Sequence, residues 1–204
     1  MPITPLNYRI VSRASAPDDL PVTVAEAREY VVLGNETDRD TTIRNLIISA
    51  RDWIEDACRT CLTATVVEQK FQCFPYGQWG RLELCREPVR SITSIAYTDD
   101  AEAAQTWSST NWKLEAGMNP PCVMLKGGKT WPTISGTEPW PITVTYAAGP
   151  ATGTPCRGGL RDAVLLLLTY RHEFPSGVNR SGQDVPLPRA VMNLISPNTI
   201  RGYV

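Results

Sequence analysis

TPCRGGLRDAVLLLLTYRHEF, residues 154–174, contains the longest apolar run of the chain, at positions 164–168. The apolar side chains that recur at helical spacing are Leu160, Ala163, Val164, Leu167, Leu168 and Phe174. Leu165, Leu166 and Tyr170 lie off that stripe, so the predicted helix is apolar on more than one side. A helix that is apolar nearly all round is buried nearly all round. We therefore expect it to be the central helix of a helical core, with one flank covered by a second copy of the protein.

The composition excludes several classes of protein. The 204 residues include 20 basic and 21 acidic side chains, for a net charge of −1, which is not the basic surface typical of nucleic-acid binding. The apolar run is far shorter than the roughly 20 residues of a membrane span, and the N-terminus lacks the apolar core of a signal peptide. We expect synthesis in the cytoplasm, no membrane contact and reduced cysteines: Cys58, Cys61, Cys73, Cys85, Cys122 and Cys156.

Two helices are predicted within residues 21–62. The first has Thr23 as its N-cap, Glu26 as the capping-box partner three residues later, and Gly34 at its end. The second covers residues 41–62, where apolar side chains from Ile43 to Cys61 recur at i, i+3 and i+4.

The polar face of the second predicted helix carries Arg51, Glu55 and Arg59 at intervals of four. This spacing predicts ion pairs on a solvent-exposed face, each worth a few tenths of a kcal/mol.

The hydrophobic period changes to two between residues 63 and 150. Short strands are predicted at 65–74, 81–85, 91–97, 105–107, 112–114, 122–125 and 142–146. Strands of this length, separated by Gly, Pro and Asn, are typical of a small antiparallel sandwich or barrel.

The opening stretch then forms the third helix. Thr154 is the expected N-cap and Pro155 the first residue. Gly158 and Gly159 cost about 1 kcal/mol each relative to Ala within a helix, so either a close backbone contact explains them or the helix begins at Leu160. A polar loop of residues 176–186 precedes the fourth helix, which Pro197 ends.

The order helix, helix, sheet, helix, helix predicts an α+β fold. Residues 21–62 and 154–197 form a four-helix core, and residues 63–150 form an antiparallel β-sandwich or barrel-like insertion between the second and third helices. Residues 1–20 are expected to be an extended N-terminal arm without a packed element, and residues 198–204 a free C-terminal tail.

Motifs that would support catalysis or metal binding do not meet their spacing requirements. His172 lies in RHEFPS, which is not HExxH, and KGGKT at 126–130 has Val123 where a phosphate loop needs glycine. Cys58 and Cys61 are either a redox pair or two small buried side chains on the apolar stripe. We expect no enzyme activity, no catalytic residue, no metal and no cofactor.

Tryptophans gather in the predicted β region and leave one alternative open. They are Trp79, Trp107, Trp112, Trp131 and Trp140. Most are expected to be core or turn anchors, but exposed ones on a β module could bind carbohydrate.

Several stretches carry a resemblance to a known family. They are PVTVAEA (21–27), LIISARDWIEDACR (46–59), the strand pair at 82–89 and 91–97, WP (131–132) with VTYAAG (144–149), and the last two helices at 160–173 and 188–195. In order and spacing over residues 21–201 they resemble the head–tail connector (adaptor) proteins of tailed phages, specifically the gp6-like and gp8-like members with a β insertion. Gly158–Gly159 and the N-terminal arm depart from the pattern.

The resemblance implies a structural virion protein in the neck of a siphovirus-like particle. It implies a homo-oligomeric ring, usually a dodecamer, that lies beneath the portal protein, extends the DNA channel used in genome ejection, and docks a stopper or tail-terminator protein. Contact with genome DNA would be non-specific. The alternatives are another neck ring, such as a stopper or tail terminator, or a carbohydrate-binding β module.

Two sets of contact residues follow from these expectations. The C-terminal side chains Ile200, Arg201, Tyr203 and Val204 are candidates for docking to the portal, since Arg and Tyr are frequent binding hot spots. The candidates for the interface between subunits are Leu165, Leu166, Tyr170 and Arg171.

Overall fold

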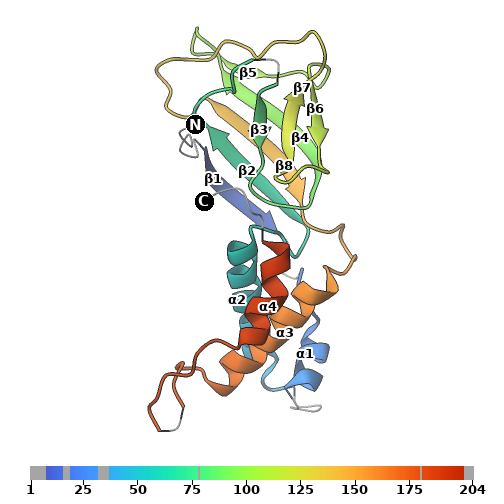
Figure 1. The fold of residues 1–204 in the computed structure, drawn as a ribbon, viewed down its shortest axis with the longest axis vertical. Helices are drawn as coiled ribbons and strands as arrows, with labels where there is room; N and C mark the ends of the chain where they lie inside the picture. Colours follow the sequence, from blue (N-terminus) through green and yellow to red (C-terminus); the bar gives the residue numbers. More distant parts are fainter. Residues whose placement is uncertain (1–7, 16–18, 32–36, 78, 180, 200–204) are drawn as a thin grey trace. The chain divides into compact units, whose positions relative to one another are not determined.

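The computed structural model describes residues 8–15, 19–31, 37–77, 79–179 and 181–199. It divides into two compact units (Figure 1). The helical unit comprises Pro17–Thr63 and Pro150–Thr199, and the β unit comprises Ala64–Gly149 together with the first strand of the chain. The described residues form four helices and two antiparallel sheets, which confirms the α+β class.

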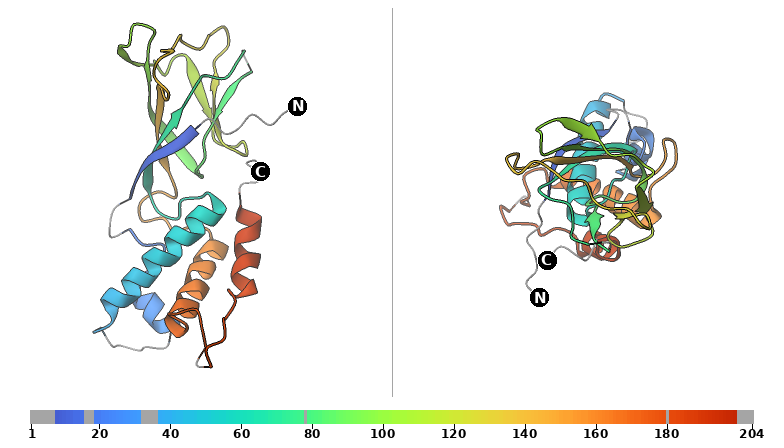
Figure 2. Two further views of the ribbon diagram at one scale, coloured as in Figure 1. Left: turned by 90° about the vertical axis from the view of Figure 1, so that its left-hand side faces the viewer. Right: turned by 90° about the horizontal axis from the view of Figure 1, so that it is seen from above.

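The helical unit contains α1 (Val24–Tyr30), α2 (Asp40–Cys58), α3 (Gly158–Glu173) and α4 (Arg189–Ile195), followed by the 3-10 turn η1 (Ser196–Asn198). Figure 2 shows α2, α3 and α4 side by side. All four helices contribute to one buried hydrophobic cluster. The predicted four-helix core is therefore present.

Helix α1 begins as its sequence predicts. Thr23 is the N-cap, and its hydroxyl accepts a hydrogen bond from the backbone N–H of Glu26 at 3.2 Å. The carboxylate of Glu26 contacts Arg161 of α3 at 2.5 Å, so this residue also links two helices. Gly34, expected at the end of the helix, lies outside the described residues.

Helix α2 buries its apolar stripe as predicted, but it also buries part of the face that was predicted to be exposed to solvent. Arg51 is 8% exposed and Glu55 only 1%, so the expectation of solvent-exposed ion pairs is wrong. The neighbouring segments cover this face: Glu55 accepts the N–H of Leu62 at 2.6 Å, and Arg51 donates to the carbonyl of Asp19 at 3.4 Å. The helix ends because Arg59 adopts a left-handed conformation with φ 56°.

Helix α3 starts later than expected. Its N-cap is Arg157, and the N–H of Thr154 instead donates to Ala151 in the preceding turn. A Cβ at Gly158 would meet no atom within 4 Å, and one at Gly159 would meet only Leu194 at 3.9 Å. A close backbone contact therefore does not explain the two glycines.

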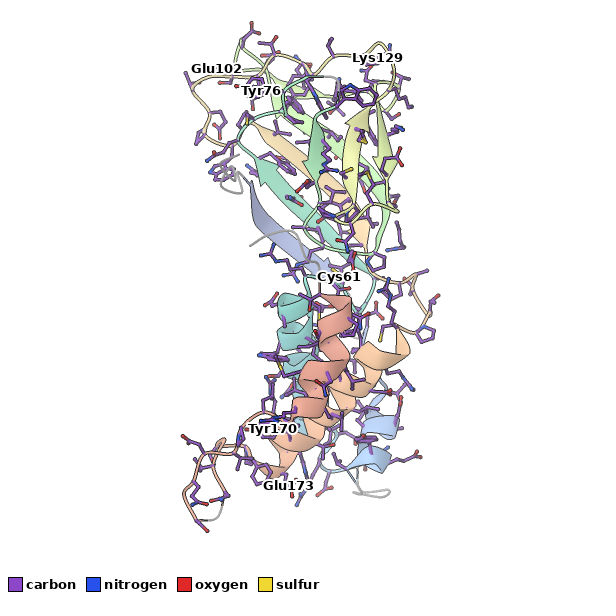
Figure 3. All side chains as sticks on the ribbon, viewed as in Figure 1. Cys61, Tyr76, Glu102, Lys129, Tyr170 and Glu173 are labelled. Atoms are coloured by element: carbon purple, nitrogen blue, oxygen red, sulfur yellow. The ribbon has the colours of Figure 1, made fainter. Side chains whose placement is uncertain are left out.

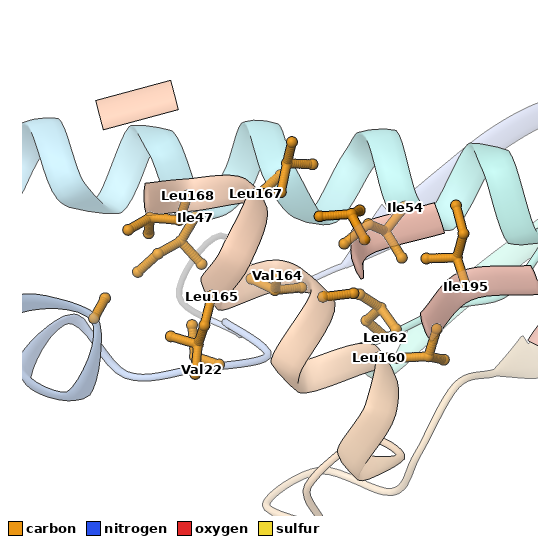
Figure 4. Close-up of a cluster of buried hydrophobic side chains, with 14 of the residues drawn as sticks. Val22, Ile47, Ile54, Leu62, Leu160, Val164, Leu165, Leu167, Leu168 and Ile195 are labelled. Carbon is orange, nitrogen blue, oxygen red and sulfur yellow. The ribbon is translucent and has the colours of Figure 1, made fainter. Parts of the chain in front are cut away.

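Helix α3 is covered by its own chain. The buried side chains are Leu160, Ala163, Val164, Leu165, Leu167 and Leu168. Leu165 points toward the segment that carries Val22, a member of the same cluster (Figure 4). The segment before α1 thus packs on the flank that carries Leu165, and cover by a second copy stays a prediction. Leu166 is half-buried.

Asn198 and Thr199, the first two residues of the expected free tail, bond to α4. The amide of Asn198 donates to the carbonyl of Leu194, and its side-chain oxygen accepts from Arg157. The hydroxyl of Thr199 donates to the carbonyl of Ile195. These bonds satisfy carbonyl groups at the end of α4, so Asn198 and Thr199 belong to the helical unit.

The β unit contains a five-stranded sheet in the order β1-β2-β8-β4-β5 and a three-stranded sheet in the order β3-β7-β6. The strands are β1 (Tyr8–Ser15), β2 (Thr65–Phe71), β3 (Arg81–Glu83), β4 (Val89–Thr98), β5 (Ala104–Thr106), β6 (Trp112–Glu115), β7 (Cys122–Leu125) and β8 (Ile142–Ala148). Neither sheet closes on itself, so the barrel-like alternative is wrong.

Strand β1 is the main difference from the predicted arm. Its backbone pairs with β2 from Tyr8↔Phe71 to Ser15↔Thr65, so residues 8–15 are an edge strand. The preceding and following Pro and Asp residues argued against a packed element, but they lie outside the strand.

Strand pairing explains how the β unit can interrupt the helices. Thr65, the first residue of β2, pairs with Ala148, the last residue of β8, and with Ser15, the last residue of β1. The chain therefore enters and leaves the sheet at adjacent positions. Because the two ends of the insertion are adjacent, α2 and α3 can pack together although the β unit separates them in sequence.

A buried polar cluster joins the two sheets. Gln69 of β2 is fully buried, donates to the carbonyl of Glu83 at 3.0 Å and accepts the N–H of Cys85 at 3.1 Å. The hydroxyl of Tyr146 also donates to Gln69, at 3.2 Å. One glutamine thus satisfies groups from both sheets, as a buried amide requires.

Among the described residues, no helix is both long enough and apolar enough to cross a membrane.

The core of the helical unit makes a direct prediction. Leu168→Ala removes a side chain with 0% exposure and should lower the free energy of unfolding of this unit by about 2–5 kcal/mol. Met192→Ala, at a position 49% exposed on α4, is the control and should change it by about 0.5 kcal/mol or less. Urea unfolding followed by helical circular dichroism measures both, and equal effects would contradict the packing described.

Candidate functional site

The β unit carries an open pocket of about 680 Å³. Two loops form most of its wall, one after β2 and one after β7. Its lining residues are Cys73, Phe74, Pro75, Tyr76, Gly77, Leu125, Gly128, Lys129, Thr130, Trp131, Pro132, Thr133 and Ile134. This volume is in the range of clefts that bind small molecules.

Aromatic side chains build the base of the pocket. The rings of Phe74 and Trp131 stack with centroids 5.0 Å apart and an interplanar angle of 21°. Trp107 lies 5.6 Å from Phe74 and 5.1 Å from Trp131, and Tyr97 meets Phe74 edge-on at 6.2 Å. Each aromatic pair adds about 0.5–1.5 kcal/mol beyond area burial, so the base is rigid.

The rim of the pocket is exposed and nearly uncharged. Tyr76 is 96% exposed, and Lys129 is the one charged side chain among the described residues that line the pocket. Figure 3 shows Tyr76 and Lys129 at the same end of the β unit. An apolar pocket beside an exposed aromatic ring is typical of surfaces that bind apolar groups.

One pattern in the sequence could have indicated this pocket. Both loops carry an aromatic residue beside proline, Phe74–Pro75–Tyr76 and Trp131–Pro132. The two loops are far apart in sequence, so the pattern alone does not predict that Phe74 and Trp131 stack.

The tryptophans do not form a common exposed surface. Trp107 is 7% exposed and Trp131 is partly buried in the aromatic base, as expected for core anchors. Trp79 is 82% exposed, but it does not line the pocket. Trp112 and Trp140 are partly exposed, so Trp79 is the one strongly exposed tryptophan among the described residues of the β unit.

The residues considered for chemistry do not assemble into a reactive group. Cys58 is buried, and its thiol points to the carbonyl of Ile195 at 3.7 Å, so it behaves as a small core side chain. His172 is in the last turn of α3, and KGGKT at 126–130 is a turn after β7. Within the described ranges, no group of His, Cys, Asp and Glu could hold a metal ion.

The candidate interface residues of α3 occupy different environments. Leu165 is in the core, whereas Leu166, Tyr170 and Arg171 are partly exposed. The hydroxyl of Tyr170 donates to the carbonyl of Val185 at 2.5 Å, which holds the loop before α4. Arg171 donates to the hydroxyl of Ser49 on α2, and burial lowers the pKa of its guanidinium from the ordinary value.

The candidate portal-docking residues Ile200, Arg201, Tyr203 and Val204 lie outside the described residues. The preceding residue, Thr199, is held by the helical unit, because its hydroxyl donates a hydrogen bond to the carbonyl of Ile195.

Comparison with known proteins finds similar folds among solved structures. The sequence matches no protein-family model and no curated protein. Among solved structures, the fold is similar to a chain in the neck of an empty gene transfer agent particle computed with C6 symmetry, with a TM-score of 0.74, 23% identity and 96% of each chain covered.

Two further structures agree. A chain in the virion of the native gene transfer agent particle has a TM-score of 0.71 and 23% identity, and one in the neck of the native particle computed with C12 symmetry has 0.70 and 22%. Each match again covers 96% of both chains.

The aromatic base of the pocket yields a stability prediction. Trp131→Ala should destabilise the β unit by about 2–3 kcal/mol, because Phe74 and Trp107 both lose a ring partner. Trp79→Ala removes an equally large but exposed side chain and should cost about 0.5 kcal/mol or less. Near-ultraviolet circular dichroism during urea unfolding compares the two variants. If Trp79→Ala proved the more destabilising, the cluster would not be the structural base.

Proposed function

We propose that this protein is a non-enzymatic structural component of the neck of a tailed phage or phage-like particle. The observation that carries the proposal is the match of both units, over 96% of each chain, to chains of gene transfer agent necks. The particular role that fits best is that of head–tail connector, or adaptor. It forms a ring below the portal, extends the DNA channel and docks the stopper or tail.

Two arguments favour a closed ring: the symmetry of the assemblies that contain the similar chains, and the geometry of contacts between identical subunits. The similar chains belong to assemblies with C6 and C12 symmetry. A head-to-tail contact between identical subunits closes into a ring when its rotation divides the circle evenly. A dodecamer is the expected form of this protein.

The partly exposed side of α3 is the surface best suited to the contact between subunits. Leu166 is an apolar side chain that the helical unit covers only in part, and Tyr170 and Arg171 lie within the next two turns. Leu165 supports this surface from the core rather than forming part of it. Tyr and Arg are residue types that often dominate interfaces.

The segment after Thr199 is the proposed site of portal docking. Ile200, Arg201, Tyr203 and Val204 combine apolar, cationic and aromatic groups. A segment that orders on its partner binds by wrapping over a surface. DNA passing through the ring would meet a chain of net charge −1, which favours weak, non-specific contact.

The interface assignment can be tested by adding a charge. Leu166→Lys should prevent ring assembly, because burying an unpaired ammonium group in a subunit contact is strongly unfavourable. Met192→Lys makes the same change at an exposed apolar position on α4 and should leave the ring intact. Mass photometry gives the number of subunits, and circular dichroism checks that both variants are folded. Rings formed by Leu166→Lys would disprove the lateral role of this face.

Portal docking can be tested separately by truncation. Removing residues 200–204 should abolish attachment to portal-bearing capsids while ring assembly and the melting temperature are retained. The truncation spares Asn198 and Thr199, whose side chains bond to α4. Cosedimentation of the purified protein with capsids measures attachment, and undiminished binding would refute the docking assignment.

The alternative within the same class is a different neck ring, such as a stopper or tail terminator. Mass photometry with purified portal discriminates between them, because the adaptor role requires direct binding to the portal.

A further inference from the structure

We infer that the aromatic pocket of the β unit is the binding site for the N-terminal segment of the same chain, residues 1–7, MPITPLN. The segment would lie across Phe74, Tyr76 and Trp131 as a short extended strap. This inference does not depend on the proposed role in a phage neck.

The pocket requires an apolar and uncharged occupant. Stacked rings form its base, the almost fully exposed ring of Tyr76 stands at its rim, and prolines 75 and 132 continue its wall. Lys129 is the one charge among the described lining residues. Such a surface gains free energy when apolar groups displace its water, at about 25 cal/mol for each Å² buried.

The N-terminal segment has the matching chemistry. It carries no charged side chain and includes Ile3 and Leu6. Pro2 and Pro5 stand three residues apart in sequence, which equals one turn of a polyproline II helix, so in that conformation both rings would face the same side. Aromatic-lined grooves recognise segments of this Pro-x-x-Pro form because the polyproline conformation loses little entropy on binding.

The sheet register places this segment within reach of the pocket. Tyr8, the first residue of β1, pairs with Phe71, which is three residues before Phe74. Paired Cα atoms are about 5 Å apart, and three residues add at most about 11 Å. Seven residues in polyproline II form extend about 22 Å, so the segment can reach the pocket of its own copy.

Attachment through β1 also compensates for weak contacts. A segment tethered by a short link is present at an effective concentration in the millimolar range. A contact that would be weak for a separate peptide can therefore be mostly formed within the chain.

Disulfide trapping tests the proposal on the full-length protein. Cys73 lines the pocket and is exposed. Burial raises the pKa of the Cys122 and Cys156 thiols, which slows their reaction at neutral pH. Thr4→Cys should therefore form a disulfide with Cys73 under mild oxidation, seen as a faster-moving monomer band on a non-reducing gel and located by peptide mass mapping. Thr4→Cys with Cys73→Ser is the negative control.

Because any tethered cysteine collides with its neighbours, the rate must depend on docking. In the Thr4→Cys background, Tyr76→Ser removes a lining ring and Trp79→Ser removes an exposed ring that does not line the pocket. We expect the first to slow the cross-link about tenfold, as loss of an aromatic anchor does, and the second to leave it unchanged. Pro2→Gly with Pro5→Gly should slow it similarly.

Equal rates in all these variants would overturn the proposal, because they would show collision without binding. A product with twice the subunit mass would also overturn it, by assigning the pocket to the segment of another copy. Tyr76 and Trp79 are both exposed, so loss of folding is not expected in either variant, and circular dichroism confirms this.

Discussion

The helical unit depends on the burial of α3. Its six buried apolar residues pack against α1, α2 and α4. These helices lie far apart in sequence. At roughly 1.5–3 kcal/mol for each large side chain buried, this helix contributes the largest share of the unit's hydrophobic stabilisation. The core is complete only when residues 19–63 and 150–199 come together.

That requirement constrains the β unit. An insertion of Ala64–Gly149 between α2 and α3 is compatible with a common helical core only if its two ends are close. The pairing of Thr65 with Ala148 meets this condition directly. Ser15, the last residue of β1, pairs with Thr65 as well.

Buried polar groups make the arrangement specific. Glu55 accepts the N–H of Leu62 and so ties the segment after α2 to the helix, and Gln69 joins the two sheets. A buried hydrogen-bonding group left without a partner costs about 1–3 kcal/mol, which penalises other packings of the same apolar residues. These residues therefore select one arrangement among those that hydrophobic burial alone would allow.

The sequence by itself determined the α+β class and the order of the elements that follow β1, because hydrophobic period is a local property. The apolar spacing from Ile43 to Cys58 is sufficient to indicate α2, and alternation indicates β2 and β8. Only the tertiary structure decided which faces are covered. Arg51 and Glu55 look exposed in a helical pattern and are buried because other segments pack over them. Leu165 lies off the apolar stripe and is buried in the same cluster as Val22. The tertiary structure also decided the pocket. Phe74 and Trp131 stack although 56 residues separate them in sequence, and a contact between distant residues produces no periodic pattern in the sequence.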